Sequence, residues 1–171
     1  GVTEIINHYG KVIVLEDDLI TASTFLEFMN QALDNYEKKS EVLQISGFSF
    51  PTSKIKPTNC SYFLTLTSTW GWATWKRAWD TIDFDCADYI VLKKNKKIAQ
   101  QFNYNGNYNY KKMFFQQMES DKISSWGIRF YWNVFKQKGV VLFPDKSLIL
   151  NNGWDSSGKH NDSYDIFPIK D

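Results

Sequence analysis

Lys11-Val12-Ile13-Val14-Leu15 is a short run rich in β-branched residues, and it ends abruptly in Glu16-Asp17-Asp18. Because the run is continuously apolar, without polar alternation, it predicts a strand buried on both faces, as in a parallel sheet. In open α/β sheets, ligands bind beyond the carboxyl ends of the strands. The three acids therefore stand where a ligand is expected.

The segments around this strand predict an alternation of helices and strands. Residues 2–8 have the apolar spacing of a short helix, and residues 25–36 carry a clear apolar stripe at helical spacing. Thr24 and Glu27 form a capping-box pattern at the start of the second helix. Residues 42–46 follow as another strand. A helix between two strands predicts a β-α-β unit, so we expect an α/β fold with a parallel sheet.

The rest of the chain predicts shorter elements. Three further runs have strand character: 62–67, 140–143 and 147–150. We also expect a turn and then a helix over 70–79, short helices and loops over 80–125, an amphipathic helix over 126–135, and a mobile tail over 151–171. No internal repeat or linker interrupts residues 1–171, which predicts a single domain.

Length, charge and composition exclude several classes of protein. The 171 residues are 43% hydrophobic and 23% charged, as in a globular domain and unlike a disordered chain. Lys and Arg number 20 against 19 acids, which argues against a protein whose main task is to bind nucleic acid. No apolar run is long enough to span a bilayer. The missing secretion leader and the two cysteines, Cys60 and Cys86, favour a reduced cytoplasm.

Aromatic residues are the unusual part of the composition. The chain has 13 Phe, 9 Tyr and 7 Trp, together 17% of its residues. This is more than the core of so small a domain needs. The excess predicts an aromatic-lined site, for which sugars and nucleobases are the natural ligands.

The acids Glu16, Asp17 and Asp18 have two interpretations. They repel one another unless a cation compensates, and a hard divalent cation with phosphate and water as further ligands fits that need. Alternatively, they favour the N-terminus of the next helix. Leu19, Ile20 and a separate cap intervene before that helix, so the sequence favours the cation site.

The order of motifs along the chain resembles the GT-A-fold glycosyltransferases. The strand that ends in Glu16-Asp17-Asp18 resembles their metal- and nucleotide-binding Asp-x-Asp strand end. Similar segments then follow in order: 25–33, 44–47, 70–75, 126–129 and 151–160. Together they resemble bacterial sugar transferases of polysaccharide gene clusters, distantly similar to N-acetylglucosaminyltransferase I. The resemblance covers residue 1 to about residue 160.

This resemblance implies a metal-dependent glycosyltransferase of polysaccharide or glycan biosynthesis. A sugar would move from a nucleotide-diphosphate sugar to a saccharide acceptor. Asp18 would contact the divalent metal, Mn or Mg, and His160 would also act on the metal or the diphosphate. Glu16 and Asp17 would support the metal and contact the ribose or the sugar. Trp70-Gly71-Trp72 would form the acceptor loop, where glycine admits close backbone approach and the indoles offer their faces.

The chain departs from the family pattern in two places. Inverting members carry a catalytic carboxylate near the start of the helix at Trp126, but residues 124–129 hold no acid. Asp121 is the candidate base, with a solvated loop acid as the alternative. The family also begins with a β-α-β half that holds the nucleotide base, and here the chain starts just before the metal strand. We therefore expect a GT-A-like sheet flanked by helices that is a partial, truncated domain.

Two other functions remain open from the sequence. The chain could be a non-catalytic remnant that binds carbohydrate or a partner through its aromatic residues. Metal-dependent phosphoester hydrolysis also uses strand-end acids, but it usually needs a second cluster of His and Asp ligands. Separately, the lysines of residues 93–97 could touch anionic lipid at a membrane surface, or could form a solvated face.

Overall fold

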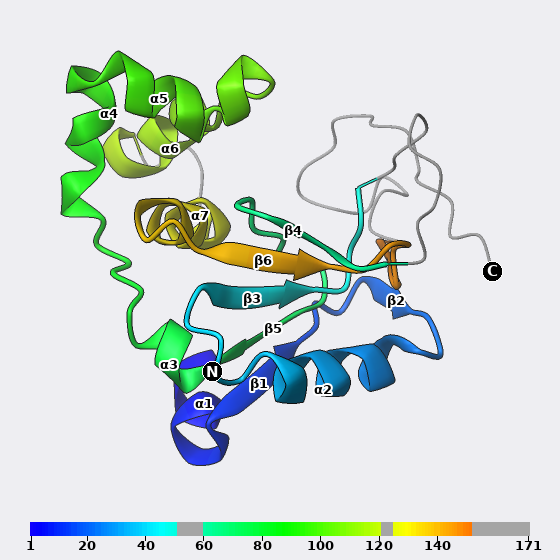
Figure 1. The fold of residues 1–171 in the computed structure, drawn as a ribbon. Coiled ribbons are helices and arrows are strands. Elements are labelled where there is room, and N and C mark those ends of the chain that lie inside the picture. The colour runs from blue at the N-terminus through cyan, green and yellow to red at the C-terminus, as the bar shows by residue number, and fades with distance from the viewer. Residues whose placement is uncertain (51–59, 121–124, 152–171) are drawn as a thin grey trace.

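Five strands form one mixed sheet in the order β1-β5-β3-β6-β4 (Figure 1). The computed structural model describes residues 1–50, 60–120 and 125–151. The sheet strands, in spatial order, are β1 (Lys11–Val14), β5 (Trp72–Trp75), β3 (Val42–Ser46), β6 (Val140–Phe143) and β4 (Tyr62–Leu64). Helices flank the sheet on both faces, so the predicted α/β class is confirmed. The predicted parallel sheet is wrong: β3 pairs parallel with β6, but the pairs β1–β5, β3–β5 and β4–β6 are antiparallel.

The position of β1 corrects the prediction from its apolar run. β1 is an edge strand of this sheet, its four residues are half-buried, and it pairs antiparallel with β5. The strand with every residue buried is β3, which pairs antiparallel with β5 and parallel with β6. β1 and β3 do run in the same direction, as a β-α-β unit requires, but β5 lies between them. An apolar run indicates that a segment can form a strand, but it does not indicate which strands lie beside it. Here β5, which is distant in the chain, lies between β1 and β3.

The segment 70–79 is also different from the prediction. Residues 72–75 form β5, and the helix α3 covers only Lys76–Trp79. Residues 149–151 form β7 (Ile149–Asn151), which pairs with β2 (Leu19–Thr21) in a separate two-stranded sheet. β2 was not expected from the sequence, because a three-residue strand after a turn has no periodicity to read.

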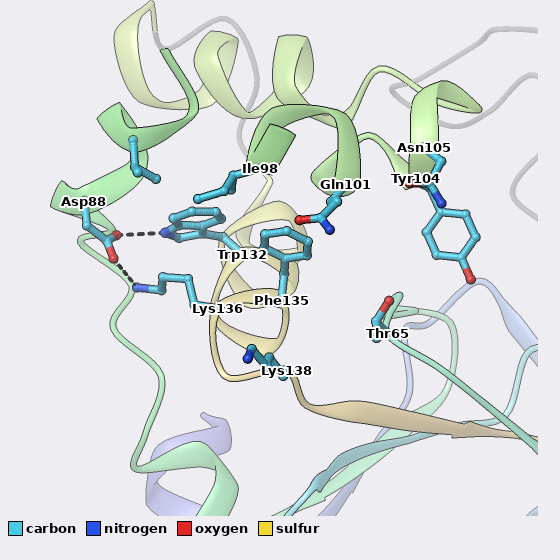
Figure 2. Close-up of a pocket in the computed structure, with 11 residues that line it drawn as sticks. Thr65, Asp88, Ile98, Gln101, Tyr104, Asn105, Trp132, Phe135, Lys136 and Lys138 are labelled. Atoms are coloured by element: carbon cyan, nitrogen blue, oxygen red, sulfur yellow. Dashed lines mark hydrogen bonds and ion pairs between the residues drawn. The ribbon is translucent and has the colours of Figure 1, made fainter. Parts of the chain in front are cut away.

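The helix α7 (Trp126–Lys136) covers one face of the sheet, and its own outer side supports a layer of short helices. These are η1 (Ala87–Ile90), α4 (Val91–Lys94), α5 (Lys96–Phe102), η2 (Tyr104–Gly106) and α6 (Tyr110–Glu119). Trp132 of α7 is buried against this layer, beside Ile98 of α5 (Figure 2). We call residues 87–119 the helical layer.

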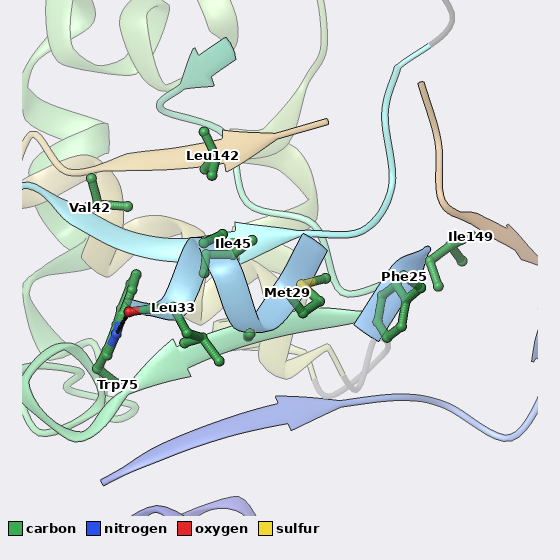
Figure 3. Close-up of a cluster of buried hydrophobic side chains, with 10 residues drawn as sticks. Phe25, Met29, Leu33, Val42, Ile45, Trp75, Leu142 and Ile149 are labelled. Carbon is green, nitrogen blue, oxygen red and sulfur yellow. Dashed lines mark hydrogen bonds between the residues drawn. The ribbon is translucent and has the colours of Figure 1, made fainter. Parts of the chain in front are cut away.

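The helix α2 (Phe25–Asn35) covers the opposite face of the sheet. Its apolar stripe, with Phe25, Met29 and Leu33, packs on Ile45 of β3 (Figure 3). The predicted capping box is wrong, because the Thr24 side chain makes no cap hydrogen bond.

The helix α1 (Val2–Tyr9) precedes β1 and ends at Gly10 in a left-handed conformation. Within the residues that the structure describes, we find no helix long and apolar enough to cross a membrane.

Candidate functional site

The candidate site lies at one edge of the main sheet, which we call the carboxyl-end edge. β1 and β3 end here, at Val14 and Ser46, and the antiparallel β5 begins here. Trp72, the first residue of β5, pairs with Val14 on one side and with Ser46 on the other. The sheet thereby brings together residues that are 26 or more positions apart in the chain.

The acids Glu16, Asp17 and Asp18 lie on the exposed turn between β1 and β2, immediately beyond this edge. The Leu19 amide donates to the Glu16 carbonyl oxygen at 3.3 Å and closes the turn. Partial burial raises the pKa of Glu16, and the charges of Asp18 and then Asp17 raise it further. A cation bound at this turn would oppose the part of the Glu16 shift that comes from the neighbouring charges.

The donor set fits a hard divalent cation only as a partial site. Carboxylate oxygens are ligands that Mg and Mn accept. Yet in the ranges 1–50, 60–120 and 125–151 no group of three His, Cys, Asp or Glu side chains could hold a metal by itself. A cation on Asp18 and Glu16 would need further oxygen ligands from phosphate and water, as is usual for Mg with phosphate substrates.

The predicted metal ligand His160 and the predicted base Asp121 lie outside the described residues. So does the predicted mobile tail, except for its first residue, Asn151, which belongs to β7. The last described residues lie next to the acids. Asn151, the last described residue, pairs with Leu19, which directly follows Asp18. The β2–β7 pair therefore brings the chain to the acids before residues 152–171 begin.

Gly71 is packed against α2, β7 and the loop that follows β3. Its φ is +55°, and its carbonyl accepts the Gly47 amide at 2.6 Å. A Cβ added at Gly71 would lie 2.6 Å from Cδ1 of Ile149 and 3.2 Å from Cε2 of Phe25. Packing alone thus explains this glycine, and its role in an acceptor loop stays a prediction.

Trp72 is placed differently from the sequence expectation. It lies in a strand rather than on a turn, and it is 1% exposed. Its ring contacts Trp126, Phe130 and Trp79, with centroid distances of 5.2, 5.6 and 6.0 Å. Its faces are therefore covered by other rings, so the idea that it offers a face to a sugar is wrong for this conformation. Its Nε1 is buried and has no hydrogen-bond partner among the described residues.

Trp70 is half-buried and makes an edge-to-face contact with Phe48 at 5.0 Å. The ring with more exposure at this place is Trp126, at 38%, in the first turn of α7. Sequence reasoning did not select Trp126 as a binding residue. Its spacing of four and eight residues from Phe130 and Val134 places it on the apolar stripe of the predicted helix, so the sequence carries no signal that this ring is exposed.

A buried polar network fixes the loops beneath these rings. The Gln44 side chain donates to the Ser68 carbonyl at 2.9 Å and accepts from the Ser68 amide at 3.1 Å. The Ser46 hydroxyl accepts from the Phe48 amide at 3.1 Å. Such satisfied buried groups hold the loops after β3 and before β5 in one arrangement.

The arrangement places three exposed carboxylates just beyond the end of β1, and it places the partly exposed Trp126 against Trp72, which pairs with Val14 of β1. Comparison with protein-family models and with curated proteins finds no match for this chain.

Proposed function

We propose that the protein transfers a sugar from a nucleotide-diphosphate sugar to a saccharide hydroxyl, with a divalent cation at Glu16-Asp17-Asp18. The observation that carries this proposal is the position of the three acids. They lie beyond the end of β1, at the edge where β3 ends and β5 begins. The resemblance of the motif order to GT-A-fold sugar transferases supports the same reaction.

On this proposal, Asp18 and Glu16 hold the cation and Asp17 contacts the ribose or sugar. When bound, Mn or Mg would neutralise charge on the diphosphate leaving group. The raised pKa of Glu16 links cation binding to loss of its proton, so binding should strengthen as the pH rises through the carboxyl range. Asp121 remains the candidate that takes the proton of the acceptor hydroxyl.

The acceptor would lie on the aromatic side of the same edge. The Trp126 ring is partly exposed, and the buried Trp72 ring packs against it at a centroid distance of 5.2 Å. An indole face is a good surface for the apolar face of a sugar ring.

The test is thermal unfolding with Mn²⁺ and a nucleoside diphosphate, with UDP and GDP tried separately. Saturation at about a hundred times Kd should raise the melting temperature by roughly 5–10 °C. Asp18→Asn should abolish the rise. Asp85→Asn is the matched control, since Asp85 is an exposed acid that follows α3, at the opposite end of β5. No rise with either nucleotide, or an equal rise in Asp18→Asn, would refute the proposal.

A second candidate is carbohydrate binding without catalysis, favoured by the exposure of Trp126. It predicts that oligosaccharides change tryptophan fluorescence without Mn²⁺ or nucleotide. It also predicts that Trp126→Ala removes this response while Asp18→Asn retains it.

A further inference from the structure

A separate pocket of about 880 Å³ lies between α7 and the helical layer (Figure 2). It lies on the side of the sheet where β6 begins and β4 ends, opposite the carboxyl-end edge that carries the acids. Lys138, which lines it, precedes the first residue of β6, and Thr65 follows the last residue of β4. β4 is antiparallel to β6, and β6 is parallel to β3, so both residues lie away from the carboxyl-end edge. The proposed function does not use this pocket.

The wall of the pocket on α7 is apolar and held in place. Trp132 and Phe135 point toward α5, where Ile98 lies against the indole (Figure 2). Nε1 of Trp132 donates to Oδ1 of Asp88 at 2.8 Å, and Nζ of Lys136 donates to Oδ2 at 2.7 Å. The Lys136 ammonium also lies 5.4 Å from the centre of the Trp132 ring. Both oxygens of Asp88 are thus engaged, and its charge is balanced by Lys136.

The charge left over in the pocket is positive. Among its lining residues, Asp88 and Lys136 cancel, and Lys138 has no carboxylate partner within the described part of the chain. The remaining polar side chains of the lining that could hydrogen-bond a ligand are neutral: Thr65, Gln101, Tyr104 and Asn105.

The helical layer around the pocket is also positively charged. The helical layer carries six lysines against two acids, a net charge of +4, whereas the whole chain is +1. A positive field over this part of the molecule attracts anions toward the pocket.

We propose that this pocket binds an amphipathic anion. The apolar part of the ligand, a ring system or hydrocarbon chain, packs on the half-buried Phe135 and Ile98, while Trp132, which is 2% exposed, supports the Phe135 ring at a centroid distance of 5.9 Å. Its single anionic group lies beside Lys138. The volume is in the range of pockets that take small organic ligands, and a mostly apolar wall with few polar groups is typical of them.

The probe for this proposal is anilinonaphthalene sulfonate, with N-phenyl-1-naphthylamine as its uncharged counterpart of the same ring body. The folded protein should bind the sulfonate saturably, one per chain. Lys138→Gln should weaken the sulfonate roughly fivefold and leave the uncharged probe unchanged, since only the ion pair is lost. Lys146→Gln, at an exposed lysine between β6 and β7, should bind both probes as the wild type does.

A second variant locates the site without touching its charge. Gln101 is exposed on α5 and lines the pocket, so Gln101→Trp should fold and should block both probes. Equal sulfonate binding by Lys138→Gln, Gln101→Trp and the wild type would overturn the proposal.

Competition identifies the source of the anion. Displacement of the sulfonate by decanoate, but not by phosphatidylglycerol vesicles, indicates a soluble amphiphile. Displacement by the vesicles indicates a lipid headgroup.

Discussion

Gly71→Ala is the substitution whose cost the structure defines best. Gly71 has a φ of +55°, a conformation that costs an L-residue about 1 kcal/mol. Its new Cβ would also stand 2.6 Å from Cδ1 and 2.8 Å from Cγ1 of Ile149, which is buried at 3% exposure. Overpacking of this kind costs about 1–3 kcal/mol. We therefore expect a loss of about 2–4 kcal/mol in the free energy of unfolding.

Gly10→Ala provides the matched control. Gly10 also has positive φ, +77°, but a Cβ there would meet nothing within 4 Å. Its cost should be the backbone part alone, about 1 kcal/mol. The difference between the two variants then measures the steric contact with Ile149.

Urea denaturation followed by tryptophan fluorescence measures these values, and Gly71→Ala should also lower the melting temperature by roughly 10 °C. Ile149→Val removes Cδ1, which should cost about 1 kcal/mol in the wild type but much less in Gly71→Ala. If Gly71→Ala proves no less stable than Gly10→Ala, the close approach of Gly71 and Ile149 does not exist.

Three further predictions follow from buried or clustered polar groups. Asn133 is 1% exposed; its side chain accepts from the Asp83 amide at 3.0 Å and donates to the Asp83 carbonyl at 2.8 Å. Asn133→Leu should therefore lower the free energy of unfolding, measured by urea denaturation, by about 3 kcal/mol. An unchanged free energy of unfolding would contradict this network. Because burial and then the charges of Asp18 and Asp17 raise the pKa of Glu16, the folded state binds that proton more tightly, and stability falls as pH rises through the carboxyl range. Glu16→Gln should therefore gain stability relative to the wild type between pH 3 and pH 7 in thermal melts, whereas parallel pH curves would exclude the effect. Burial raises the pKa of Cys86 to about 11, so Ellman's reagent at pH 8 should react with exposed Cys60 alone until denaturant is added, and two equally fast thiols would disprove it.

Local patterns were sufficient for the elements that bury one clear face. Residues 25–36 were predicted as a helix from apolar spacing, and α2 covers Phe25–Asn35. Residues 140–143 were predicted as a strand and form β6. Both predictions succeed because a continuous face of these segments is buried, so tertiary packing and local periodicity agree.

The identity of β5 could not be predicted in this way. Trp72–Trp75 is only four residues long and runs directly into α3. Its sequence carries bulky rings but no readable period. It becomes a strand because β1 and β3 present backbone groups on both of its sides, with Ala73 paired to Ile13 and to Ile45. Hydrogen bonding to two neighbours stabilises a strand that its own residues do not specify.

The sequence by itself determined the acids after β1, the helices α2 and α7, and the α/β class, because each depends on residues close in the chain. Only the tertiary structure decided that β1 is an edge strand of the sheet. It also decided that the Trp72 ring is buried by other aromatic rings, whereas the Trp126 ring is partly exposed. It also placed Ile149, which is more than seventy residues away in the chain, so close to Gly71 that a side chain at position 71 would clash with it. These facts depend on which distant segments pair and pack, and no local period encodes that choice.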